Sequence, residues 1–166
     1  MYRAHGNPVY DFIQVLGRAS KGEGKTVLYE RRDVRGTMKA LTKGRTVWYG
    51  PDQDYGLVQR LFAPFFGIKA ATVYGTARFA KMTGAAVVPV SHVRLTGSEG
   101  YQVTIYPPLE EFPAGDDLVD ATRINQIIEK FILLQPDQYL WAHRRFKNRP
   151  EGESDLYNLP GKSKLT

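Results

Sequence analysis

Segments with helical periodicity alternate along this chain with short apolar segments, and this alternation limits the possible folds more than any other feature. The spacing of apolar side chains predicts four helices, which begin near Pro8, Asp33, Tyr74 and Asp117 and end near Gly17, Gly44, Met82 and Leu134. Apolar runs predict four strands, at Lys25–Glu30, Thr46–Tyr49, Ala85–Val93 and Tyr101–Tyr106. The last two strands are expected to form a hairpin. Strands separated by helices are typical of an α/β domain, so we expect a mostly parallel central sheet flanked by helices.

An acidic loop follows one of these predicted strands directly. Its sequence is Pro51-Asp-Gln-Asp-Tyr-Gly56. One aspartate can make a turn by bonding its own backbone. Two carboxylates at this place instead favour a functional loop that holds an arginine, positions a hydroxyl-bearing substrate or binds a metal, because ligands gather where the strands of parallel sheets end. A metal is the weaker alternative, since no histidine or further carboxylate is close in sequence.

A basic cluster, His143–Arg149, lies beside Trp141 and Phe146 near the end of the chain. Clustered cations of this kind bind anionic lipid headgroups or a membrane surface. The same composition serves nucleic acid, where aromatic side chains stack on bases. A third alternative is a solvated face whose aromatic side chains are buried.

No self-sufficient catalytic motif is recognisable. Cysteine is absent, which excludes disulfides, thiolate nucleophiles and cysteine-bound zinc. None of the three histidines, His5, His92 and His143, is followed five positions later by Asp or Glu. A glycine-rich phosphate loop and a G-x-S-x-G elbow are also missing. We therefore assign no catalytic and no metal-binding residue, and treat the histidines as structural. The net charge of +6 favours anionic partners.

Several motifs in register along the chain resemble one known family. They are Tyr2-Arg3 with Asn7-Pro8, Arg32–Gly36, Val47–Gly56, Phe62–Gly67, Gly75-Thr76, Met82–Ala85 with Val88-Pro89, Gln138–Trp141, and His143–Lys147 continued by Arg149–Gly152. Together they resemble the lauroyl and myristoyl transferases of lipid A biosynthesis in Gram-negative bacteria. The resemblance covers about residues 1–157 and implies the fold of the glycerolipid acyltransferases, with its N-terminal part missing here.

The resemblance also implies a reaction and a site. In the family, a histidine in an H-x-x-x-x-D/E motif deprotonates a hydroxyl of a lipid A precursor, which attacks the thioester of an acyl carrier protein, and no cofactor is needed. That motif and the membrane anchor are not found in this sequence, so we expect a C-terminal fragment that is inactive alone. The expected location is the cytoplasmic face of the bacterial inner membrane, with the membrane surface, and not nucleic acid, as a further partner. The implied substrate-binding residues are Arg3, Asp33, Asp52, Asp54, Tyr55, Arg144 and Arg145.

Two hypotheses from different classes remain open at this point. The first is an acyltransferase domain at residues 1–147, followed by a polar, flexible tail at 148–166. The second is a non-catalytic basic module that binds anionic lipid headgroups.

Overall fold

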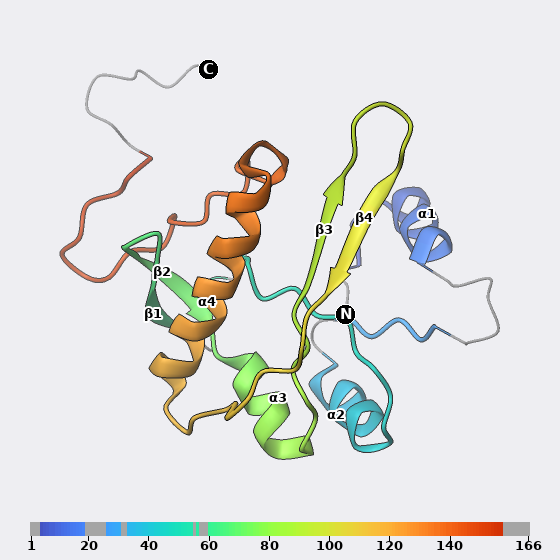
Figure 1. Ribbon diagram of the computed structural model, residues 1–166, viewed down its shortest axis with the longest axis horizontal. Helices are drawn as coiled ribbons and strands as arrows, with labels where there is room; N and C mark the ends of the chain where they lie inside the picture. The colour runs from blue at the N-terminus through green and yellow to red at the C-terminus, as the bar shows by residue number, and fades with distance from the viewer. Residues whose placement is uncertain (1–3, 19–25, 31–32, 55, 57–59, 158–166) are drawn as a thin grey trace. The chain divides into compact units, whose positions relative to one another are not determined.

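The computed structural model describes residues 4–18, 26–30, 33–54, 56 and 60–157 (Figure 1). The chain divides into two compact units, Met1–Gly50 and Pro51–Thr166, and each is described by itself. Of the helices in the described residues, none combines the length and apolar composition that a bilayer span requires.

Within residues 4–18, 26–30 and 33–50 the first unit forms two helices, both predicted from the sequence. Helix α1 spans Pro8–Arg18, and the side chain of Asn7 accepts hydrogen bonds from the N–H groups of Val9 and Tyr10 at 3.0 and 3.2 Å. Helix α2 spans Val34–Thr42 and is capped by Asp33, which accepts from the N–H of Gly36 at 2.8 Å. Glycine fits at position 36 because a Cβ there would lie 2.2 Å from the Asp33 carboxylate. Local capping therefore fixes both helix starts.

The two strands predicted in this unit are not formed among the described residues. Residues 26–29 and 46–49 lie outside any strand, and Glu30 makes a single bridge. Trp48 is 64% exposed, so the run Thr46–Tyr49 is not the buried strand that its composition indicated. An apolar run becomes a strand only when another strand pairs with it.

The described residues of the second unit form two antiparallel hairpins and two α-helices (Figure 1). Strands β1 (Arg60–Phe65) and β2 (Ile68–Val73) form the first hairpin, and β3 (Val90–Arg94) and β4 (Tyr101–Ile105) form the second. Helix α3 (Gly75–Thr83) lies between the hairpins in sequence and ends at Gly84, which is left-handed. Helix α4 (Asp117–Leu134) is followed by the short 3-10 helix η1 (Pro136–Gln138).

The expected mostly parallel sheet is wrong, and the fold is mixed α/β. Both two-stranded sheets of the described residues are antiparallel. The sequence predicted the β3–β4 hairpin and helices α3 and α4, but it did not predict β1 and β2. Their turn is Phe66-Gly67, where both residues have positive φ (48° and 75°), as two-residue hairpin turns require. Tight turns of this kind reverse the chain, so the strands that they join cannot be parallel.

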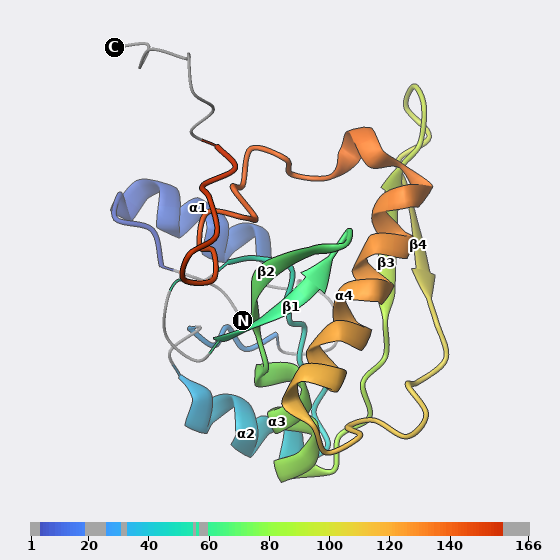
Figure 2. The same cartoon turned by 90° about the vertical axis from the view of Figure 1, so that its left-hand side faces the viewer.

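Helix α4 packs along the β1–β2 hairpin, and this contact forms the core of the second unit (Figures 1 and 2). Phe65, Ala70 and Ile132 are buried together, and Tyr139 and Phe146 pack against them. Phe146 comes from the basic cluster, so the core attaches the C-terminal segment to the hairpin.

A side-chain clasp joins the β3–β4 hairpin to η1. Gln138 Nε2 donates to the carbonyl oxygen of Arg94 at 2.9 Å, and its Oε1 accepts from the Arg94 N–H at 2.8 Å. Tyr106, just after β4, stacks on Phe131 of α4 with ring centroids 4.8 Å apart. Both hairpins are thus held to the same helical segment.

Candidate functional site

The carboxylate of Asp54 binds the acidic loop to the basic cluster. Only 3% of Asp54 is exposed. Asn148 Nδ2 donates to both of its carboxylate oxygens at 2.8 Å, and the N–H of Gly56 donates to Oδ1 at 2.8 Å. Two segments that the sequence singled out separately therefore lie in contact.

The backbone of the acidic loop is held by the same cluster. The N–H of Asp54 donates to His143 Nε2 at 2.9 Å, and Lys147 Nζ donates to the carbonyl oxygen of Asp54 at 3.0 Å. The hydroxyl of Tyr139 donates to the carbonyl oxygen of Asp52 at 3.4 Å. A ring nitrogen that accepts a hydrogen bond carries no proton, so His143 is neutral in this arrangement and its proton is on Nδ1.

The surroundings keep both ring side chains uncharged. Burial, together with the charge of Asp52, raises the pKa of Tyr139 to about 12, although Arg145 opposes the shift. Burial lowers the pKa of His143 below its ordinary value of 6.5, and the ammonium of Lys147 adds to this, while Asp52 and Asp54 oppose it. The neutral imidazole that accepts from Asp54 is therefore the form favoured at neutral pH.

We expect the folded protein to lose stability as the pH falls below 6.5. The unfolded chain binds a proton at His143 near the ordinary pKa, whereas the folded chain binds it only at lower pH. This contribution to the free energy of unfolding is therefore complete above pH 6.5 and is lost as the pH falls through the lowered pKa. Urea unfolding measured from pH 8 to 5 checks this. His143→Gln, whose amide oxygen can still accept from Asp54, should flatten the loss.

The matched control for that series is His92→Gln, because His92 is an exposed histidine of β3. It should leave the acid-side loss in place. If it flattens the profile as much as His143→Gln does, the loss does not come from the Asp54–His143 bond.

Arg145 lies at the centre of a buried polar network and is 1% exposed. Its Nη1 donates to the carbonyl oxygen of Ala71 at 2.6 Å, and its Nη2 donates to Thr72 Oγ1 at 3.0 Å and to Asn125 Oδ1 at 3.4 Å. Asn125 Nδ2 in turn donates to the carbonyl oxygen of Pro64 at 2.8 Å and to Thr72 Oγ1 at 3.0 Å. The network joins both strands of the first hairpin, helix α4 and the basic cluster.

The guanidinium of Arg145 also packs on the core, with its carbon 5.0 Å from the centroid of the Phe65 ring. Its Nε is buried without a hydrogen-bond partner among the described residues. Burial lowers the pKa of Arg145, while electrostatic interaction with Tyr139, Asp54 and Asp52 opposes that shift. The acidic loop thus supplies negative charge near a buried cation.

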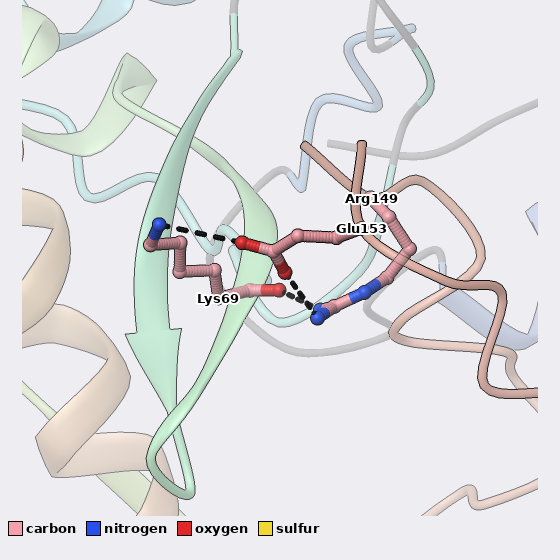
Figure 3. Close-up of polar contacts among 3 residues, drawn as sticks. All are labelled: Lys69, Arg149 and Glu153. Carbon is pink, nitrogen blue, oxygen red and sulfur yellow. Dashed lines mark hydrogen bonds and ion pairs between the residues drawn. The ribbon is translucent and has the colours of Figure 1, made fainter. Parts of the chain in front are cut away.

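A third link ties the last residue of the basic cluster to strand β2. Arg149 donates through Nη1 to the carbonyl oxygen of Lys69 and through Nη2 to the Glu153 carboxylate (Figure 3). The same Glu153 pairs with the Lys69 ammonium at 3.3 Å. The three residues therefore close a ring of polar contacts.

The structure brings four of the seven predicted substrate-binding residues into one unit. Asp52 and Asp54 lie in the acidic loop, and Arg144 and Arg145 lie in the basic cluster packed on it. Asp33 belongs to the other unit, where it caps α2. The remaining two, Arg3 and Tyr55, lie outside the described residues.

Sequence reasoning missed the residues that link the predicted ones. Asn148 and Asn125 were not singled out, and Tyr139 and Lys147 were named only within longer motifs. No local sequence pattern indicates these contacts, because Asp54 and Asn148 are 94 positions apart and Arg145 and Ala71 are 74 positions apart. Only the proximity of a carboxylate loop and a cation cluster in the fold reveals the pairing.

Two charged side chains of this site, those of Asp52 and Arg144, make no hydrogen bond or ion pair with the other described residues. Asp52 is half-buried and its side chain accepts no hydrogen bond from the described residues. Arg144 is exposed, with its guanidinium 5.5 Å from the Tyr157 ring. No group of three or more His, Asp or Glu among the described residues could hold a metal ion. A hollow of about 270 Å³, lined by residues that include Arg94, Thr96 and Asp137, lies at the β3–β4 turn and not beside Asp54.

The chain is similar to bacterial enzymes of one class. The family described as bacterial lipid A biosynthesis acyltransferase matches residues 1–148. The chain is 41% identical over 158 residues to the lipid A biosynthesis lauroyltransferase of Escherichia coli K12, covering 95% of this chain and 51% of that protein. It is 43% identical over 157 residues to the palmitoleoyltransferase of the same organism, covering 94% and 50%. With the myristoyltransferase the identity is 30% over 158 residues, covering 95% and 48%.

The chain therefore spans about half the length of the curated relatives that it matches. The family match covers most of the chain, including the acidic loop and the basic cluster up to Asn148. This chain belongs to the bacterial lipid A biosynthesis acyltransferase family.

Proposed function

We propose that this chain forms the acceptor-binding part of an enzyme that transfers a fatty acyl group from acyl carrier protein to a hydroxyl of a lipid A precursor. Membership in the family supports the reaction class, and relatives named for lauroyl, palmitoleoyl and myristoyl transfer support an acyl donor. The thioester of the donor is already activated, so the transfer needs no cofactor. The proposed place of action is the cytoplasmic face of the bacterial inner membrane, and nucleic acid is not a proposed partner.

The observation that carries this proposal is the bonding of Asp54 to the basic cluster. It holds an acidic loop and a set of cations side by side, which suits an acceptor that has both sugar hydroxyls and phosphates. Carboxylates accept from hydroxyls, and guanidinium groups bind phosphate through paired donors.

Within this site we propose two kinds of role. Asp52 and Arg144 contact the acceptor, because their side chains are available to it. Asp54 and Arg145 are buried and bonded within the protein, so they act by positioning the loop and the cluster. Arg3, Asp33 and Tyr55 are proposed as further acceptor contacts on the strength of the resemblance alone.

The chemical step requires a base that removes the proton from the acceptor hydroxyl. The hydroxyl oxygen then attacks the thioester carbon, the carbon–sulfur bond breaks, and the carrier-protein thiol leaves. His143 is a poor candidate for this base, since its Nε2 already accepts from the Asp54 N–H. We propose that the base is the histidine of an H-x-x-x-x-D/E motif in polypeptide outside these 166 residues.

A transfer assay with acyl carrier protein thioester and lipid A precursor tests this function. We expect no turnover from the chain alone, and turnover from a longer polypeptide in which a segment with the H-x-x-x-x-D/E motif precedes it. In that longer protein Asp52→Asn should raise KM for the acceptor about tenfold, the loss of one charge-assisted hydrogen bond, and leave KM for the donor unchanged.

Asp137→Asn is the control, because Asp137 is an exposed carboxylate of η1. Robust transfer by the chain alone would place the base among these 166 residues, with His5 as the first suspect. A longer protein that binds the acceptor without turnover would instead favour the non-catalytic lipid-binding module.

A further inference from the structure

Three side chains of the segment 139–147 hold the backbone of the acidic loop. Two of them donate, the Tyr139 hydroxyl to the carbonyl oxygen of Asp52 at 3.4 Å and Lys147 Nζ to that of Asp54 at 3.0 Å. The third is His143, whose Nε2 accepts from the N–H of Asp54 at 2.9 Å. Of these three side chains, His143 is therefore the one that loses its bond to the loop when its bonding atom takes up a proton.

A proton on Nε2 of His143 sets two donors against each other. The charged imidazole donates from both ring nitrogens, so the N–H of Asp54 no longer has an acceptor there. Only 3% of Asp54 is exposed, and water therefore has little access to replace the ring. A buried N–H without an acceptor costs about as much as a lost hydrogen bond, so the loop or the ring must move.

The charges around His143 decide which way its charged ring is drawn. They are Asp52 and Asp54 from the loop, and Lys147 and Arg145 from the basic cluster. The two cations repel an imidazolium, and the Asp54 carboxylate already accepts three hydrogen bonds. The carboxylate of Asp52 accepts none from the described residues and attracts the charged ring. An imidazolium at position 143 is thus drawn to the side chain that we propose for the lipid acceptor.

We propose that His143 is a positioning residue for the acidic loop, and that a proton on its ring withdraws Asp52 from the lipid acceptor. The neutral ring fixes Asp54 and leaves the Asp52 carboxylate to a hydroxyl of the lipid. The charged ring releases the Asp54 N–H and pairs with Asp52, which weakens binding of the lipid acceptor in acid. The part assigned to Asp52 rests on the proposed function, whereas release of the Asp54 N–H needs no ligand.

Nuclear magnetic resonance of the full chain tests the release of Asp54 without a ligand. As the pH falls, the amide signal of Asp54 should change with the same midpoint as the ring of His143. Its hydrogen exchange, corrected for the intrinsic effect of pH, should become about tenfold faster when the ring is charged, because one hydrogen bond is lost. The ring of His92, exposed on β3, is the internal reference. An Asp54 amide that ignores the titration of His143, or follows that of His92, would overturn the proposal.

Two replacements of His143 should have opposite effects on the same amide. His143→Gln keeps an acceptor that does not titrate, so the Asp54 amide should stay protected as the pH falls. His143→Arg offers donors only and is always charged, so its Asp54 amide should exchange at neutral pH about as fast as in the acid form. His92→Gln and His92→Arg are the matched controls and should leave this amide unchanged. Equal exchange in His143→Gln and His143→Arg would contradict the assignment, because a ring needed only for packing is lost in both.

Transfer kinetics test the part assigned to Asp52. In the longer polypeptide with the H-x-x-x-x-D/E motif, KM for the lipid acceptor should rise about tenfold as His143 is protonated. KM for the acyl carrier protein thioester should stay unchanged, because Asp52 is assigned to the lipid alone. His143→Gln should remove this dependence on pH, a comparison that also cancels the titration of the lipid phosphates. Asp52→Asn should leave KM for the lipid high throughout.

This inference and the proposed function fail in different ways. If the Asp54 amide follows the His143 proton but KM for the lipid does not, the role of Asp52 in the proposed function is wrong. If His143→Gln retains the full dependence of this KM on pH, His143 is not the positioning residue and the proposed function stands.

Discussion

Replacing Arg145 with alanine should lower the free energy of unfolding by about 3–5 kcal/mol, the cost of removing one partner from a buried charged network. The guanidinium donates to Ala71, Thr72 and Asn125 and packs on Phe65. Alanine leaves these acceptors buried with fewer donors and opens a cavity between the hairpin and the basic cluster. Urea unfolding followed by circular dichroism measures the loss.

The neighbouring residue supplies a matched control. Arg144 carries the same charge one position earlier but is exposed, and its contact with the Tyr157 ring lies at the surface. Arg144→Ala should therefore change the free energy of unfolding by less than about 1 kcal/mol. A loss as large as that of Arg145→Ala would mean that the network does not carry the stability we assign to it.

Replacing Asp54 with asparagine should cost about 2 kcal/mol, the usual range for a hydrogen bond to a charged group. The amide introduced at position 54 can still accept from the N–H of Gly56, but it turns its donor toward the donor of Asn148. Asn148→Asp alone should also destabilise the protein, because two carboxylates then face each other. The midpoint of urea unfolding, at an unchanged dependence on urea, measures both effects.

A double variant in which the two residues are exchanged tests whether the loss comes from the bond between positions 54 and 148. In the double variant Asp54→Asn with Asn148→Asp, a carboxylate again accepts from an amide across the same contact, so at least half of the loss should be recovered. Such coupling of neighbouring residues is commonly about 0.5–3 kcal/mol. Additive losses in the double variant would contradict a direct bond between the two positions.

The helices could be predicted from the sequence because their signals are local. Asn7, Asp33 and Asp116 each bond to N–H groups within three residues, and Gly84 ends α3 in a left-handed conformation. The strands depend on partners and were predicted less well. The run Thr46–Tyr49 has strand composition but no strand conformation. Strand β1 contains Pro64, which argues against a strand when the sequence alone is considered.

The candidate site was predicted in its parts and not in its contacts. The acidic loop was singled out because two carboxylates follow an apolar run; that run is not a strand, and a role of the loop in binding stays a prediction. The sequence could not separate Arg144 from Arg145, two identical side chains in adjacent positions. Their difference arises from packing, since one projects over Tyr157 and the other enters the core beside Phe65. Burial is a property of the fold and has no signature in a pair of arginines.

The clasp between Gln138 and Arg94 has a consequence for how the second hairpin can be extended. Arg94 lies opposite Tyr101 in the β3–β4 ladder, and the N–H of the next residue, Leu95, donates to Gly100. Because successive residues of a strand point their backbone groups to opposite sides, the N–H and carbonyl of Arg94 point away from β4, toward the outer edge of β3. The primary amide of Gln138 supplies one acceptor and one donor to these two groups, as the backbone of a neighbouring strand would. Gln138 therefore blocks strand pairing at one end of that edge. Any additional strand that joins β3 must therefore end before it reaches Arg94, which limits its length on that side.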